Sequence, residues 1–143
     1  MNFLVDHNLR GHSLVLAGVL AASGWLDLIS IRFILFEEVG LAVTSDDRIV
    51  WRYAQANQMI LITANRSMKG KDSLEQVMRE ENTPTSLPVV TIGNIERLLA
   101  EPDYRLSQLW WVKCILRYIS QERGGGTNHK DTKDTKIDRS YVN

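Results

Sequence analysis

Short apolar runs alternate along this chain with longer segments in which apolar residues recur at helical spacing. Runs of the first kind are typical of strands buried on both faces of a parallel sheet, and they lie at residues 2–6, 28–33, 59–63 and 89–92. Helical spacing and capping residues predict helices at residues 13–22, 44–57, 72–81, 95–100 and 104–120. Strands that alternate with helices favour right-handed crossovers. The pattern therefore predicts an α/β fold with a mainly parallel sheet.

The predicted helix at residues 13–22 is apolar almost throughout. Its apolar residues form two rows at helical spacing, one of Leu14, Ala17, Gly18 and Ala21 and the other of Leu16 and Leu20. We expect the helix to end near Ser23 and Gly24, because glycine is common just past the last turn of a helix.

The chain has 143 residues, a length that suits one domain with a core of its own. We place the domain at residues 1–122 and a flexible polar tail at residues 123–143, with three consecutive glycines at residues 124–126. The tail has too few apolar residues to offset the entropy lost on ordering. Basic and acidic residues number 17 each, so the net charge neither favours nor excludes a nucleic-acid partner.

The compartment is inferred from patterns that the sequence lacks. No run reaches the roughly 18 apolar residues of a membrane span, and the N-terminus shows no signal-peptide pattern. We therefore predict a cytoplasmic protein with no membrane contact. Cys114 is the single cysteine, so an intramolecular disulfide is excluded. Its apolar neighbours predict a packed thiol rather than a reactive one.

Polar residues follow two of the predicted strands, at the edge where ligands bind to parallel sheets. Asp6 and Asn65 lie just past strand ends, and Asp46 and Asp47 open a helix near the same edge. Carboxylates that converge there would bind Mg²⁺ or Mn²⁺, since these ions prefer oxygen ligands. Such an ion can activate water and stabilise charge on a phosphate. From spacing alone, the commoner alternative is a loop acid at Asp6 and helix caps at Asp46 and Asp47.

Three segments carry a resemblance to a known family. Residues 3–9, FLVDHNL, resemble the opening FLxDENLP segment of a family of small bacterial PIN-like proteins. Residues 44–49, TSDDRI, resemble its ASDEEI helix start, and residues 59–68, MILITANRSM, resemble its xVLITxDxDF strand and loop. The segments occur in the family's order and at about its spacing. The resemblance covers roughly residues 1–99.

The resemblance implies a three-layer α/β/α fold and an acidic pocket that, in active PIN domains, holds a divalent metal and cuts RNA. Carried over by position, Asp6 is the first acid of the pocket, and Asp47, or else Asp46, is the second. Asn65 stands where the third acid of the family usually falls, and Ser67 where a fourth often does. An amide oxygen can bind a metal but brings no charge. Fewer carboxylates should therefore weaken the binding of a hard dication.

Two further residues are candidates for this pocket. Asp72 would supply missing charge if the preceding loop folds back, whereas a solvent-facing acid at the start of a helix is the commoner alternative. His7 stands where the family has glutamate. A single imidazole at an oxygen-rich site is more often a loop residue than a metal ligand.

Basic residues follow the same strand end. Arg66, Lys69 and Lys71 would contact RNA phosphates, which dominate affinity for nucleic acids, and Arg10 with His12 would widen that patch. A solvated surface loop explains the first three equally well. Polar residues at a helix entry are the commoner explanation of Arg10 and His12.

The sequence leaves three functions open. The first is a metal-dependent endoribonuclease, with the role of toxin in a bacterial toxin–antitoxin pair and an antitoxin protein as its partner. The second is a catalytically degenerate PIN-like module that binds RNA or a protein. The third is a homodimeric scaffold whose copies meet through Trp110 and Trp111. These two indoles can also stack on bases, although on an apolar helix they more often pack.

Overall fold

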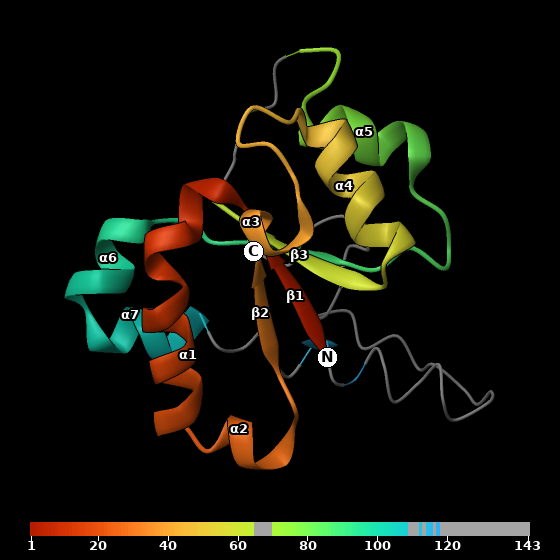
Figure 1. Ribbon diagram of the computed structural model, residues 1–143. Coiled ribbons are helices and arrows are strands. Elements are labelled where there is room, and N and C mark those ends of the chain that lie inside the picture. Colours follow the sequence, from red (N-terminus) through yellow and green to blue (C-terminus); the bar gives the residue numbers. More distant parts are fainter. Residues whose placement is uncertain (65–69, 109–111, 113, 116, 118–143) are drawn as a thin grey trace, which may run out of the picture.

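The computed structural model describes residues 1–64, 70–108, 112, 114–115 and 117. The described residues form a four-stranded sheet in the order β2-β1-β3-β4, and all its pairings are parallel (Figure 1). The strands are β1 (Asn2–Val5), β2 (Arg32–Leu35), β3 (Met59–Thr63) and β4 (Val89–Thr91). The predicted α/β class with a parallel sheet is thus confirmed.

Helical segments connect the strands. They are the 3-10 helix η1 (His7–His12) and the α-helices α1 (Ser13–Ala22), α2 (Trp25–Leu28), α3 (Phe36–Val39), α4 (Asp47–Ala56), α5 (Leu74–Glu81), α6 (Ile95–Ala100) and α7 (Pro102–Gln108). Among the described residues, none of these helices is long and apolar enough to cross a membrane.

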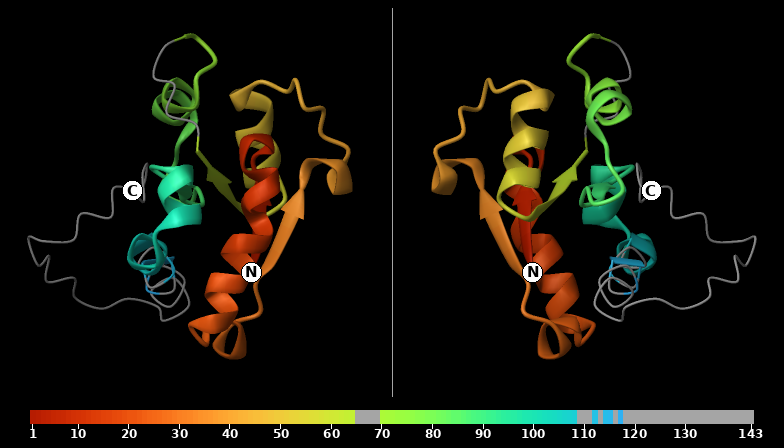
Figure 2. Two further views of the ribbon diagram at one scale, coloured as in Figure 1. Left: turned by 90° about the vertical axis from the view of Figure 1, so that its left-hand side faces the viewer. Right: turned by 90° about the vertical axis from the view of Figure 1, so that its right-hand side faces the viewer.

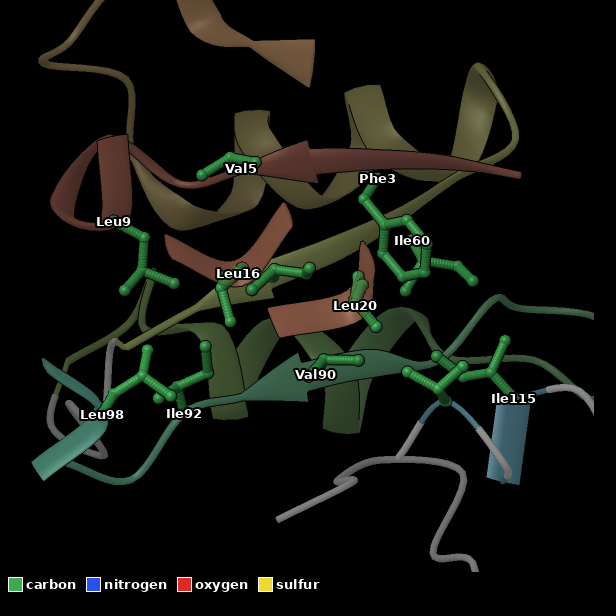
Figure 3. Packing of buried hydrophobic residues seen from close by; sticks show 12 residues of the cluster. Phe3, Val5, Leu9, Leu16, Leu20, Ile60, Val90, Ile92, Leu98 and Ile115 are labelled. Carbon is green, nitrogen blue, oxygen red and sulfur yellow. The ribbon is translucent and has the colours of Figure 1, made fainter. Parts of the chain in front are cut away.

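The strands are buried on both faces because their side chains alternate between two hydrophobic clusters. Phe3 and Val5 of β1 point into the first cluster, with Leu16 and Leu20 of α1 (Figure 3). Leu4 of β1 belongs to the second cluster, which α4 and α5 cover. The opposite views of Figure 2 show α1 in front of the sheet from one side and α4 from the other. Each fully buried leucine stabilises such a core by about 1.5–3 kcal/mol.

The second strand was predicted at the wrong place. Residues 25–28 form α2, and β2 pairs with β1 only from Arg32 onward, in register with Asn2. Leu28, predicted to be in the strand, is 78% exposed. An apolar run shows that residues are hydrophobic but does not show where a neighbouring strand begins, so pairing with β1 decided the bounds.

The helices agree better with the sequence pattern. α1 and α6 have the predicted bounds. α4 starts at Asp47, three residues later than predicted, because Asp46 caps the helix. α5 starts two residues later than predicted, at Leu74, because the Ser73 hydroxyl accepts a hydrogen bond from the Gln76 amide and caps the helix. α3 lies in a segment for which no helix was predicted. Trp110, Trp111 and the tail at residues 123–143 lie outside the described residues.

Candidate functional site

The order of the strands identifies one place in the sheet as the expected ligand site. β2 lies on one side of β1, whereas β3 and then β4 lie on the other. Connections therefore leave the β1–β3 pair in opposite directions. In parallel sheets, ligands bind outside the carboxyl ends of the strands at such a switch point. Asp6 directly follows β1, and Thr63 ends β3.

Hydrogen bonds hold Asp6 at the switch point. Its amide donates to the Ile62 carbonyl at 2.9 Å, and its own carbonyl accepts from the Leu9 amide at 2.8 Å. Its Oδ2 accepts a hydrogen bond from the buried Thr63 hydroxyl at 2.6 Å. Asp6 itself is only partly buried. The carboxylate therefore has a fixed position between two strands and is still reached by solvent.

A row of polar side chains crosses three strands at this edge. Asp6, Thr63 and Thr91 each lie two residues past a member of the second cluster, so they point to the same face, toward α4 and α5. Thr63 and Thr91 are paired in register. The Thr91 hydroxyl is buried and has no hydrogen-bond partner within the described part of the chain, which costs about 1–3 kcal/mol if water does not satisfy it. The site thus has unused hydrogen-bonding capacity.

The connections around the strand ends supply further polar groups. The Asn8 side chain accepts a hydrogen bond from the Ala64 amide at 3.4 Å, so η1 contacts the chain just past β3. Asn65, the predicted third site residue, follows directly and lies outside the described residues, as does Ser67.

Asp46 and Asp47 each cap the N-terminus of a helix. Asp46 caps α4, because its Oδ1 accepts a hydrogen bond from the Ile49 amide at 2.9 Å. Asp47 Oδ2 accepts from the Leu74 amide at 3.0 Å and so caps α5 from a different helix. Capping, the alternative interpretation of this pair, is therefore observed. Each carboxylate has a second oxygen, so capping by itself leaves open whether either acid also binds a metal.

Asp72 takes part in an ion-pair cluster between α4 and α5, whose centre is Arg48. The Arg48 guanidinium donates to Asp72 at 3.0 Å and to Glu80 at 2.8 Å, and it also pairs with Glu81. These hydrogen bonds raise the pKa of Arg48. Arg52, with Arg48, lowers the pKa of Glu81 to about 2. Asp72 is exposed, as the solvent-facing alternative expects, and it pairs with Arg48.

Nothing in the sequence pointed to Arg48, whose acidic partners lie 24 to 33 residues away. Its Nη2 also donates to the Lys71 carbonyl at 3.1 Å. Arg48 therefore ties the turn before α5 to the start of α4. Only the packing of α4 against α5 reveals this role.

The predicted basic patch is only partly described. Lys71 is exposed. Arg10 forms an ion pair with Glu37 at 2.9 Å, and about half of each side chain is exposed. Arg66 and Lys69 lie outside the described residues.

Three further titratable side chains are His7, His12 and Cys114. The Nδ1 atoms of His7 and His12 are buried and have no hydrogen-bond partner among residues 1–64 and 70–108 or the other described positions. Cys114 is buried, as predicted, and burial raises the pKa of its thiol. A raised pKa disfavours the reactive thiolate, which supports the packing role.

The described residues contain no group of three or more His, Cys, Asp or Glu side chains that could hold a metal ion. Mg²⁺ does not need such a group, because it is usually bound through one or two carboxylates together with waters and substrate phosphates. Among the described residues, Asp6 Oδ2 accepts from Thr63 and nothing is bonded to Oδ1. Thr91 lies on β4, two strands away from Asp6, so the Asp6 carboxylate is the described group that fits a cation with few protein ligands.

Comparisons with models of protein families, with curated proteins and with solved structures each give no match. The resemblance to PIN-like proteins therefore stays a prediction based on the three sequence segments.

Proposed function

We propose that this protein is a metal-dependent endoribonuclease whose site is the carboxyl edge of β1 and β3. The observation that carries the proposal is the position of Asp6, a fixed and partly exposed carboxylate at the switch point of a parallel sheet. The resemblance to PIN-like proteins supports RNA as the substrate. It also supports the role of toxin in a toxin–antitoxin pair, with an antitoxin protein as partner.

Asp6 would hold the cation, Mg²⁺ or Mn²⁺, through Oδ1, while the Thr63 hydroxyl keeps Oδ2 oriented. When bound, the cation supplies positive charge beside the phosphate and lowers the pKa of water. Asn65 would add a neutral oxygen, and Asp47 or Asp46 a second carboxylate. Lys71, with Arg66, Lys69 and Arg10, would attract the phosphate backbone by charge.

One observation favours a second candidate, a degenerate module that binds RNA or a protein without cleaving it. Asp46 and Asp47 already accept capping hydrogen bonds, and the described residues hold no cluster of three acids. In this case Asp6 and Thr63 would be a structural pair between β1 and β3.

Cleavage of single-stranded RNA by the purified protein, with Mn²⁺ or Mg²⁺, tests the proposal. Asp6→Asn keeps an oxygen that accepts from Thr63 but removes the charge, so we expect cleavage to fall at least 100-fold without a change in the melting temperature. Asp103→Asn, at an exposed aspartate on α7, is the matched control and should cleave like the wild type.

Equal cleavage by wild type and Asp6→Asn would contradict the enzyme proposal and point to a contaminating nuclease. Absence of cleavage in every variant, with RNA binding retained, would support the degenerate module instead. Thermal melting with and without Mn²⁺ separates these outcomes further, because a ligand that binds the native state raises its stability.

A further inference from the structure

Helix α1 has an apolar face that the rest of the described chain leaves uncovered. Leu16 and Leu20 point into the first cluster and are buried (Figure 3). On the other side, Leu14 is 83% exposed, and Gly18, Ala21 and Ala22 are exposed with it. A helix that is apolar all round is normally buried on all sides. The solvent side of α1 is therefore unlike that of an ordinary surface helix.

We propose that α1 is the contact surface between two copies of this chain, with the two α1 helices antiparallel and Gly18 at the centre of the crossing. A two-fold axis there makes the surface self-complementary. Leu14 lies one turn before Gly18 and Ala22 one turn after it. In the antiparallel arrangement, Leu14 of each copy therefore lies opposite Ala22 of the other, a large side chain against a small one.

Gly18 allows the two helices to approach closely. A Cβ atom built on Gly18 meets no atom within 4 Å, so the space outside this residue is open in the single chain. The absence of a side chain at the centre of the crossing lets the backbones of the two helices come nearer than larger residues would allow.

The charges around α1 select a second copy in the antiparallel orientation. The helix itself carries no charged residue, so two copies meet without like-charge repulsion along its length. Exposed Arg10 precedes the helix, and exposed Asp27 follows it on α2. An antiparallel pair brings Arg10 of one copy toward Asp27 of the other, whereas a parallel pair brings like charges together. Antiparallel helix dipoles favour the same orientation.

Two features complete the surface. Arg10 binds Glu37 through Nε, and its other guanidinium N–H groups are available to a carboxylate of the second copy. Leu26 and Leu28 of α2, which packs against α1, are 38% and 78% exposed. They add apolar area at the end of the helix. A stable interface buries about 800 Å² on each partner, so this additional area favours a stable contact.

Sedimentation of the full chain over a range of concentrations tests the contact. We expect the wild type to form a dimer, and Leu14→Glu to raise its dissociation constant at least tenfold, because two charges would enter an apolar contact. Leu99→Glu on α6, 48% exposed in the wild type, is the matched control and should dimerise normally. A wild-type monomer at every concentration, or equal weakening by both substitutions, would overturn the proposal.

A charge exchange tests the orientation without touching the apolar row. Arg10→Glu and Asp27→Arg should each weaken the dimer, and the two together should restore it, since the pair is re-formed with its signs reversed. Failure of the double variant to recover, with all three proteins folded by circular dichroism, would overturn the antiparallel arrangement.

Discussion

Helices α1 and α4 cover opposite faces of one sheet, but their solvent sides differ in chemistry. Both bury a row of apolar residues, Leu16 and Leu20 on α1 and Val50 and Ala54 on α4. α4 carries Arg48, which pairs with acids of α5. α1 has no charge on any side. The inner row decides that a helix packs on the sheet, whereas the outer face decides what the helix meets next.

The two rows of α1 should differ most in their effect on stability. Leu16→Ala should destabilise the fold by about 2–5 kcal/mol, because it leaves a cavity in a packed core. Leu14→Ala should change the free energy of unfolding by only about 0.5 kcal/mol or less, as is usual at exposed positions. Urea denaturation at a concentration too low for dimers measures both. Similar losses would show that the outer row is also packed within one chain.

The ion-pair cluster between α4 and α5 should respond to pH, whereas α1, which has no charged residue, should not. Ion pairing holds the pKa of Glu81 at about 2 in the folded chain, below the usual 4.5. A lowered pKa contributes stability that is present above the unfolded value. That stability is lost as the pH falls from about 4.5 through about 2.

Melting temperatures of wild type and Glu81→Gln between pH 6 and pH 2 measure this contribution. We expect the wild type to melt higher at pH 6 and the gap to close as the pH falls. Glu96→Gln, at an exposed position on α6, serves as the control and should track the wild type. A gap that stays constant across this range would contradict the assignment.

The smallest effect should be at Gly18. Gly18→Ala should stabilise the single chain by roughly 0.5–1 kcal/mol, because alanine loses less backbone entropy in a helix and its Cβ meets no neighbour. Denaturation of dilute protein measures this gain. Gly24→Ala is the contrasting control, since Gly24 has φ 78° and a side chain there is strained. If Gly18→Ala destabilises the dilute chain, the space outside Gly18 is not open.

Three strands could be read from the sequence because both of their faces are buried. β1, β3 and β4 coincide with continuous apolar runs. β2 begins at exposed Arg32, inside a mostly apolar stretch at residues 28–36, so the apolar pattern does not mark its start. The helix caps Asp46 and Asn94 were likewise predictable, since capping depends only on residues three positions away. A hydrogen bond between residues three positions apart can therefore be predicted from the residue types in one short segment.

The candidate site was predictable only in part. That Asp6 follows a strand is visible in the sequence, because the apolar run stops there. Its hydrogen bond to Thr63 joins residues 57 positions apart, and no local sequence pattern predicts a contact between residues so far apart. The same holds for Asp47, whose partner is the amide of Leu74, and for Arg48 with its acids on α5.

The sequence by itself determined the α/β class, most of the elements and the residue at the end of the first strand, because hydrophobic periodicity and capping act over a few residues. Only the tertiary structure decided the strand order, the register of β2 and the partners of Asp6, Asp47 and Arg48. It also decided which of the two apolar rows of α1 faces the core. Those choices depend on which surfaces meet in space, and burial and ion pairing between distant segments carry no local signature.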